Sequence, residues 1–273
     1  MKIAVSGASG LIGTRLIELL KDKHEIIPLG SQECDITDLN SVSSALKTLD
    51  FDVLVHLAAY TNVDGAEIEK DKAYKLNVDG TKNIFETCLN LNKKMIYIST
   101  DFVFDGKKPP YDELTVPNPL GYYAKTKFEG EKIVKNKAMI VRISYPFQEF
   151  DIVQPKPDFI HRLVNIFAQK KQISMMFDAA ITPTFIDDIV YGIEYLCENF
   201  KPEIFHLVGG KTYTPYEIGQ FILKKLSLDE SLVQKTTFKE YSQGKTERPQ
   251  YSIILSSKNN FHRMKSLEEV LNI

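Results

Sequence analysis

Short apolar runs alternate with stretches of helical periodicity along the first half of the chain. Residues 2–6 form such a run, residues 7–13 are rich in glycine, and apolar side chains then recur at helical spacing to Leu20. Comparable apolar runs lie at residues 25–29, 51–58, 94–98 and 138–143. A strand followed by a helix, repeated several times, is typical of a parallel sheet with helices on both faces. The pattern therefore predicts an α/β fold with a doubly wound parallel sheet.

The alternation is weaker after Tyr145-Pro146, and residues 154–157 are predicted to form a loop. The helical patterns and short apolar runs of this half lie at residues 159–170, 173–177, 185–199, 204–208 and 215–226.

The glycine-rich segment follows the first predicted strand and precedes the first predicted helix. Glycine lets the backbone approach a pyrophosphate, and the free amides of a helix N-terminus stabilise its negative charge. The glycines fall at every third position, unlike the fingerprint Gly-x-Gly-x-x-Gly, so an ordinary turn before a helix is the alternative. The position after the first strand favours a dinucleotide site. The cofactor contacts predicted in this segment are Gly7, Ser9, Gly10, Leu11, Ile12 and Gly13.

The end of the second predicted strand bears on the choice between NAD and NADP. An NAD enzyme normally carries an acid there that binds the ribose 2′-hydroxyl, whereas residues 30–32 are Gly-Ser-Gln. Arg15 is placed to meet a 2′-phosphate, so we favour NADPH over NADH, although a solvated surface charge is the alternative. Asp35 or Ile36 is predicted to contact the adenine, and one polar residue at 35–38 to cap the next helix.

Further candidates follow the third predicted strand, at the sheet edge where open α/β folds bind ligands. The segment Leu57-Ala58-Ala59 would leave space beside a cofactor, and we assign Thr61 and Val63, which follow it, to the substrate.

Two polar residues lie within predicted regular elements. His56 has no partner acid and is interpreted as a packed strand histidine. Asn77 lies inside a helix predicted over residues 67–91, where asparagine is intrinsically unfavourable. We expect Asn77 to make either a structural hydrogen bond or a contact near the cofactor.

A threonine, a tyrosine and a lysine occur together in residues 99–127. Thr100 ends the fourth predicted strand, and Asn118-Pro119 has the form of an N-cap followed by proline at the first helical position. Tyr123 and Lys127 are four residues apart on that helix and therefore share a face. A nearby ammonium is expected to lower the pKa of the phenol. A half-buried aromatic and a solvated lysine are the alternatives.

The composition narrows the class of ligand. The chain has 273 residues, 43% of them apolar, which is enough for a buried core. With 34 basic and 36 acidic residues its formal net charge is −2, so we expect a small-molecule partner and neither nucleic acid nor a membrane. Three widely separated cysteines predict reduced thiols in a cytoplasmic protein without a metal. No apolar run approaches the roughly 20 residues that span a bilayer, and we expect no signal peptide.

With these residues in view, the chain resembles the extended short-chain dehydrogenase/reductases, and within them the dTDP-4-dehydrorhamnose reductase family. The likeness covers nearly the whole chain and rests on GASGLIG, CDITD, HLAAYTNVDGAE, STDFVFDG and NPLGYYAKTKFEGE, in this order. The resemblance implies a Rossmann domain for NAD(P), residues 1–145 and 182–207, and a smaller α/β substrate domain, residues 146–181 and 208–273.

The resemblance also implies a reaction and roles for individual residues. The reaction would be NADPH-dependent reduction of the C4 ketone of dTDP-4-dehydro-6-deoxy-L-mannose to dTDP-L-rhamnose. Thr100, Tyr123 and Lys127 would be catalytic, and the cofactor contacts would extend to Asn77, Ser99, Tyr123 and Lys127. The residues assigned to the nucleotide-sugar substrate are Thr61, Val63, Thr100, Asp101, Phe102, Tyr145 and Arg248. We allow for a homodimer.

Four positions depart from that family where the substrate would lie. Tyr145 stands where the family has tryptophan, Ala179 and Ile181 where it has glutamine and glycine, and Ile253 where arginine is frequent. These departures leave the exact nucleotide sugar open. Phe102 replaces the glutamate of related dehydratases, which disfavours dehydration. The alternatives are an epimerase or dehydratase of the same superfamily, and a non-catalytic subunit similar to the regulatory subunit of methionine adenosyltransferase.

Overall fold

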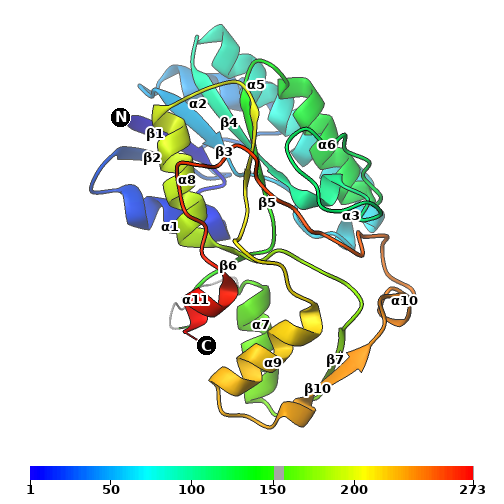
Figure 1. Ribbon diagram of the computed structural model, residues 1–273. Coiled ribbons are helices and arrows are strands. Elements are labelled where there is room, and N and C mark those ends of the chain that lie inside the picture. The colour runs from blue at the N-terminus through cyan, green and yellow to red at the C-terminus, as the bar shows by residue number, and fades with distance from the viewer. Residues whose placement is uncertain (151–156, 273) are drawn as a thin grey trace.

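The computed structural model describes residues 1–150 and 157–272, so residues 154–156 of the predicted loop lie outside the described residues. A parallel sheet of six strands has the order β2-β1-β3-β4-β5-β9 (Figure 1). The strands are β1 (Lys2–Ser6), β2 (Glu25–Leu29), β3 (Val53–His56), β4 (Lys94–Thr100), β5 (Met139–Ile143) and β9 (Ile204–Leu207). The strand order reverses at β1, as in a doubly wound Rossmann fold. The predicted fold class is confirmed.

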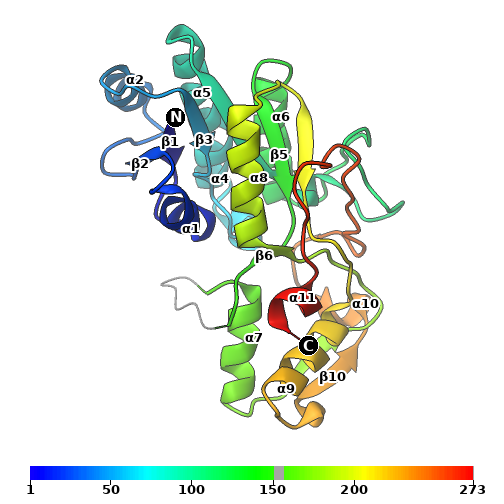
Figure 2. The same ribbon diagram turned by 60° about the vertical axis from the view of Figure 1, so that its left-hand side comes forward.

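Helices cover both faces of this sheet (Figures 1 and 2). One face lies under α1 and α8, and the other under α2, α5 and α6. Their bounds are α1 (Leu11–Leu20), α2 (Leu39–Lys47), α5 (Gly80–Asn90), α6 (Tyr122–Val134) and α8 (Ile186–Glu198). Successive strand residues point to opposite faces, so Val5 and Val55 enter the first core and Ala4 and Leu54 the second. Strands buried on both faces explain the nearly continuous apolar runs of the sequence.

A smaller α/β unit lies beyond the carboxyl ends of the central strands (Figure 2). The chain enters it after β5 and returns to the sheet with α8 and β9. Its elements are β6 (Pro146–Phe147), α7 (Phe159–Ala168), β7 (Ile173–Met176), β8 (Thr184–Phe185), α9 (Pro215–Lys225), a 3₁₀ turn (Glu230–Leu232), β10 (Val233–Thr236), α10 (Phe238–Tyr241) and α11 (Leu267–Leu271). Two parallel pairs, β7 with β10 and β6 with β8, and an apolar core of its own hold this unit together.

The continuous helix predicted over residues 67–91 is wrong. It is divided into α3 (Gly65–Ile68), α4 (Lys70–Tyr74), a π-helical turn (Lys75–Asp79) and α5. Glu69 leaves helical geometry between α3 and α4, with φ −99° and ψ +50°. The π turn contains Asn77, and π turns commonly occur where a side chain is needed for a tertiary contact.

The start of α6 also differs from the prediction. Gly121 is the N-cap, and Asn118 lies before the helix, where its Nδ2 donates to Asp105 Oδ2 at 2.9 Å. Asn118 is therefore bound within the preceding loop and does not cap the helix. Asp38 is the N-cap of α2, as expected for residues 35–38. Among the described residues, none of the helices has the length and apolar character required to cross a bilayer.

Candidate active site

A cavity of about 600 Å³ lies at the carboxyl ends of the central strands and is lined by both units of the fold. Most of the predicted site residues line it, which brings the glycine-rich segment and the catalytic set into one space. The predicted residues that line the cavity are Gly7, Ser9, Gly10, Leu11, Ile12, Gly13, Asp35, Ile36, Leu57, Ala58, Ala59, Thr61, Ser99, Thr100, Asp101, Tyr123, Lys127 and Tyr145.

The glycine-rich turn forms one wall. The Gly10 amide donates to the Gly7 carbonyl at 2.9 Å, and α1 begins at the next residue. Gly7 has a φ of +74°, and a Cβ there would lie 2.6 Å from the Ala58 nitrogen, so only glycine fits. Gly10, the N-cap residue, makes no side-chain cap. The amides of the first turn of α1 are therefore available to an anion.

Lys127, on α6, lines the same cavity. Its Nζ donates to the Ile98 carbonyl at 2.7 Å and lies 4.1 Å above the ring centroid of Tyr97. The Tyr97 hydroxyl in turn donates to the Lys127 carbonyl at 3.1 Å. Gly130 permits this approach, because a Cβ at that position would collide with the Tyr97 hydroxyl. Helix α6 is thus fixed on β4 with Lys127 directed at the strand end.

Burial sets the protonation states of Tyr123 and Lys127. It lowers the pKa of Lys127 to about 7, while the Glu131 carboxylate one turn further on acts in the opposite direction. Burial raises the pKa of Tyr123 to about 12, against a hydrogen bond with Thr100 that lowers it. Among the protein groups around Tyr123, desolvation therefore outweighs the lowering of the pKa that was expected from a nearby ammonium. Tyr123 keeps its proton at neutral pH, as a proton donor must.

Asp101 organises the hydroxyl groups beside Tyr123. Its Oδ1 accepts from Thr100 Oγ1 at 3.1 Å, and its Oδ2 accepts from Ser144 Oγ at 3.0 Å and from the Ser252 hydroxyl. Burial raises the pKa of this carboxyl, and the three hydroxyls oppose that rise. Ser252 belongs to the last part of the chain, so Asp101 ties that part to the end of β4. The Thr100 hydroxyl must turn away from Asp101 to reach a ligand.

Aromatic rings complete the wall near Tyr123. Tyr145 has a left-handed φ of +39°, and its ring centroid lies 6.1 Å from that of Phe102 and 5.6 Å from that of Phe159. Phe102 meets the Tyr123 ring edge-on at 6.1 Å but does not line the cavity. Phe102 therefore packs against the two tyrosines. Its predicted contact with the substrate is not supported, because Phe102 is not among the residues that line the cavity.

Arg15 does not face the cavity. Its Nε and Nη2 donate to the two carboxylate oxygens of Asp187 at 2.7 Å each, and its Nη1 lies 2.8 Å from Glu18. A guanidinium held by two carboxylates is not placed to receive a 2′-phosphate. These ion pairs do not support the assignment of Arg15 to the cofactor.

Asn77 and His56 have structural partners. Asn77 is fully buried; its Oδ1 accepts from the Tyr60 amide at 2.7 Å, and its Nδ2 donates to Thr126 Oγ1 at 2.9 Å. Asn77 thus fixes the loop after β3 against α6 and does not line the cavity. His56 pairs with Ser6 Oγ at 2.6 Å, and burial lowers its pKa to about 3. It is a packed strand histidine, as interpreted from the sequence.

Two further substrate candidates lie outside this cavity. Val63 does not line it. Arg248 lines a second cavity of about 470 Å³, together with Lys245 and Tyr251, and its Nη2 lies 2.5 Å from the Asp64 carboxylate.

Several lining residues were missed by the sequence reasoning. Three of them follow β2 and lie close to Asp35 in the sequence: Gly30, Ser31 and Cys34. They could have been predicted, because the end of the second strand was already expected to contact the cofactor. Asp158 and Arg162 come from α7 of the smaller unit. No local pattern in the sequence marks them, because only the tertiary fold brings α7 to the cavity.

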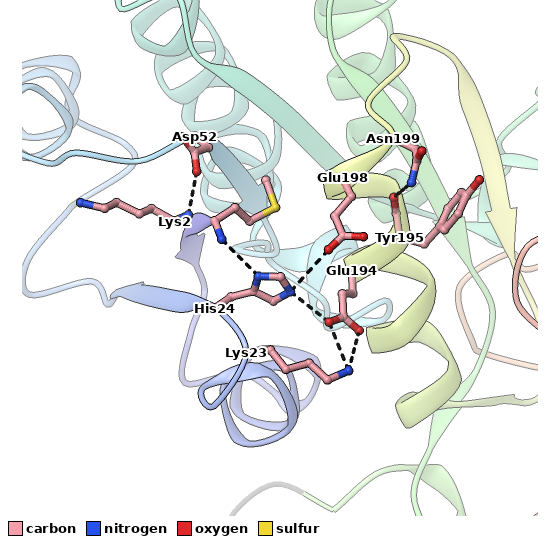
Figure 3. Close-up of polar contacts among 9 residues, drawn as sticks. Lys2, Lys23, His24, Asp52, Glu194, Tyr195, Glu198 and Asn199 are labelled. Carbon is pink, nitrogen blue, oxygen red and sulfur yellow. Dashed lines mark hydrogen bonds and ion pairs between the residues drawn. The ribbon is translucent and has the colours of Figure 1, made fainter.

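A separate polar cluster lies at the opposite edge of the sheet, where β2 begins (Figure 3). His24 Nε2 lies 2.9 Å from Glu194 and 4.0 Å from Glu198, a spacing that a metal ion could use. The His24 Nδ1 faces the amino terminus at 3.4 Å, and Lys23 lies 3.4 Å from Glu194. These groups neutralise one another, and we assign the cluster a structural role between α8 and the start of β2.

Comparison with known proteins gives a consistent result. The family model described as RmlD substrate binding domain matches residues 1–269. A dTDP-4-dehydrorhamnose reductase of Aggregatibacter actinomycetemcomitans is 30% identical over 246 residues, 86% of this chain and 80% of the relative. Methionine adenosyltransferase 2 subunit beta of Bos taurus is 29% identical over 252 residues, 86% of this chain and 75% of that protein.

A solved structure has the same fold over almost the whole length. The crystal structure of dTDP-4-dehydrorhamnose reductase from Bacillus anthracis in complex with NADP has a TM-score of 0.91 and 29% identity. The match covers 99% of this chain and 97% of that one.

Proposed function

Because the chain belongs to the RmlD substrate binding domain family, we propose that it is an NADPH-dependent reductase of nucleotide sugars. The reaction is reduction of the C4 ketone of dTDP-4-dehydro-6-deoxy-L-mannose to dTDP-L-rhamnose. One observation carries this proposal: Thr100, Tyr123 and Lys127 line the same cavity as an uncapped, glycine-rich helix N-terminus. The named relatives with this activity support the choice of substrate.

The residues present fit a dinucleotide. The N-terminus of α1 offers free amides for the pyrophosphate. Asp35 and Ile36 line the same cavity and would contact the adenine. Ser99 Oγ is buried in the lining without a hydrogen-bond partner in residues 1–150 and 157–272. A buried hydroxyl without a partner is costly, and a polar ligand would satisfy it. Lys127 is positioned to hold the nicotinamide ribose.

The residues of the chain act on the ketone oxygen. When bound, the reduced cofactor supplies the hydride to C4. Tyr123, protonated at neutral pH, donates its phenolic proton to the oxygen as negative charge develops there. The Lys127 ammonium stabilises the phenolate that remains. Thr100 turns its hydroxyl from Asp101 to the same oxygen and orients it, a gain from positioning.

The four positions that depart from the family do not all lie at the cavity. Of the four positions, only Tyr145 lines the cavity. Ala179 and Ile181 are buried, and the Ile181 backbone exchanges two hydrogen bonds of 2.9 Å with Tyr213. The smaller ring at Tyr145 is therefore the departure that acts directly on the ligand space.

A rival within the same fold is an epimerase or dehydratase. A dehydratase of this type needs a carboxylic acid at residue 102, next to Tyr123, and the phenylalanine there supplies none. An epimerase regenerates its nicotinamide in each cycle, so it shows no net oxidation of NADPH.

A second candidate is a non-catalytic regulatory subunit. The 29% identity to a methionine adenosyltransferase subunit favours it, and the retained Thr100, Tyr123 and Lys127 favour an enzyme. Recovery of a methionine adenosyltransferase with the tagged protein, without reductase activity, would decide for the subunit.

The direct test follows the absorbance of NADPH and of NADH with dTDP-4-dehydrorhamnose and with its UDP and GDP analogues. We expect oxidation of NADPH with the dTDP compound and formation of dTDP-L-rhamnose. No oxidation with any of the three would overturn the proposal.

A further inference from the structure

We propose that Arg162, which lines the same active-site cavity as the glycine-rich turn, binds a diphosphate there. Arg162 belongs to α7, and its side chain lines the cavity together with Pro157 and Asp158. The lining of the cavity therefore includes both an uncapped helix N-terminus and an arginine of the smaller unit. The inference rests on the proposed function only in that both ligands of such a reductase carry a diphosphate.

Arg162 differs from the other arginines in its availability. The chain has five arginines. Four of them pair with carboxylates: Arg15 with Asp187, Arg142 with Glu131, Arg248 with Asp64 and Arg263 with Glu269. Arg162 forms no ion pair with any residue that the structure describes. Within residues 1–150 and 157–272, its side chain makes one hydrogen bond, from Nε to the Asp158 carbonyl at 3.4 Å.

Few basic residues line the cavity, so each of them matters for the binding of an anionic ligand. Arg162 and Lys127 are the basic residues among the described lining residues. Lys127 is buried at the reacting end and is bound to the Ile98 carbonyl. Arg162, in contrast, is exposed. A ligand with a diphosphate therefore meets one accessible cationic side chain among those residues.

The neighbouring Asp158 carboxylate does not form an ion pair with this guanidinium. Asp158 is the N-cap of α7 and is buried. Its oxygens accept hydrogen bonds of 2.9 Å from the Gln148 amide, the His161 amide and His161 Nδ1. The carboxylate is thus satisfied within the protein. The planar guanidinium of Arg162 is left to offer paired donors to phosphate oxygens, a geometry that lysine cannot reproduce.

Two ligands could supply the diphosphate: the cofactor and the nucleotide sugar. The test is equilibrium binding of NADPH alone, and of dTDP and dTMP in the presence of NADP⁺, to the wild type and to Arg162→Met. The loss of charge-assisted hydrogen bonds should raise one Kd by about 10- to 100-fold. A rise for NADPH assigns Arg162 to the cofactor pyrophosphate. A rise for dTDP, larger than for dTMP, assigns it to the nucleotide sugar.

Matched variants separate binding from folding. Arg263→Met removes an exposed guanidinium that does not line the cavity and should leave both Kd values unchanged. Arg162→Lys keeps the charge and should recover part of the affinity. If Arg162→Met has the wild-type thermal unfolding midpoint, and both its NADPH and dTDP affinities lie within about twofold of wild type, the proposal is overturned. These measurements need no turnover, so an absence of reductase activity would count against the proposed function alone.

Discussion

The ammonium of Lys127 donates a hydrogen bond of 2.7 Å to the backbone carbonyl of Ile98, near the end of β4. This bond fixes the distance between α6 and the strand that carries Thr100. Tyr123, one turn earlier on α6, is thereby held over the same strand end. The proposed catalytic set is therefore positioned by one helix and one strand.

Replacement of Tyr123 by phenylalanine tests the proton donor. Loss of the phenol should lower turnover by at least about 100-fold, because no other protonated group takes its place. The Kd of NADPH should stay at the wild-type value. Tyr122→Phe is the matched control, since the Tyr122 ring lies 5.4 Å from Lys70 Nζ and is not among the residues that line the cavity. Turnover within tenfold of wild type in Tyr123→Phe would remove Tyr123 from the mechanism.

The lowered pKa of Lys127 predicts that the stability of the protein depends on pH. Its pKa is about 7 in the folded protein and 10.5 is the ordinary value. Between these pH values the unfolded chain binds more protons, so stability rises with pH across this window. Lys127→Met should remove that rise. Urea unfolding at pH 7, 8 and 9 measures it, and parallel profiles for wild type and variant would contradict the pKa assigned to Lys127.

The buried pair of Arg142 and Glu131 connects β5 to α6. Nε and Nη2 of Arg142 donate to the two carboxylate oxygens at 2.8 and 2.7 Å. Arg142→Met should destabilise the protein by about 3–5 kcal/mol, because it leaves a buried carboxylate without a partner. The double variant with Glu131→Leu should recover most of this loss. Equal unfolding free energies for the single and double variants would show that the charge left behind is not the cause.

Arg15 tests the choice of cofactor. Because Asp187 and Glu18 hold its guanidinium, Arg15→Met should change the ratio of the NADPH and NADH dissociation constants by less than about threefold. Fluorescence titration of both reduced cofactors gives this ratio. A tenfold loss of the preference for NADPH would instead support the contact between Arg15 and the 2′-phosphate that the sequence suggested.

Local patterns allowed much of the site to be predicted. The glycine-rich turn lies within one strand-to-helix connection, and Tyr123 and Lys127 lie within one helix. Their relative positions therefore follow from spacing along a single element. The carboxyl ends of parallel strands share one edge of the sheet, which placed Thr100 with them.

The failures concern partners that are distant in the sequence. Arg15 pairs with Asp187, 172 residues later, so its charge is neutralised by a contact that no local pattern shows. Asn77 meets Tyr60 and Thr126 through a π turn that helical periodicity does not predict. The protonation of Tyr123 depends on burial, which exists only after the chain has folded.

The most direct test of the proposed reaction is transfer of deuterium from labelled NADPH to the sugar. NADPH deuterated at the transferred position of the nicotinamide is incubated with dTDP-4-dehydrorhamnose, and the product is analysed by mass spectrometry. Net reduction predicts dTDP-L-rhamnose that carries one deuterium at C4, with one NADPH oxidised for each product molecule. Unlabelled product, or protein that binds NADPH and leaves the ketone unreduced, would contradict the assignment of Thr100, Tyr123 and Lys127 to this reaction.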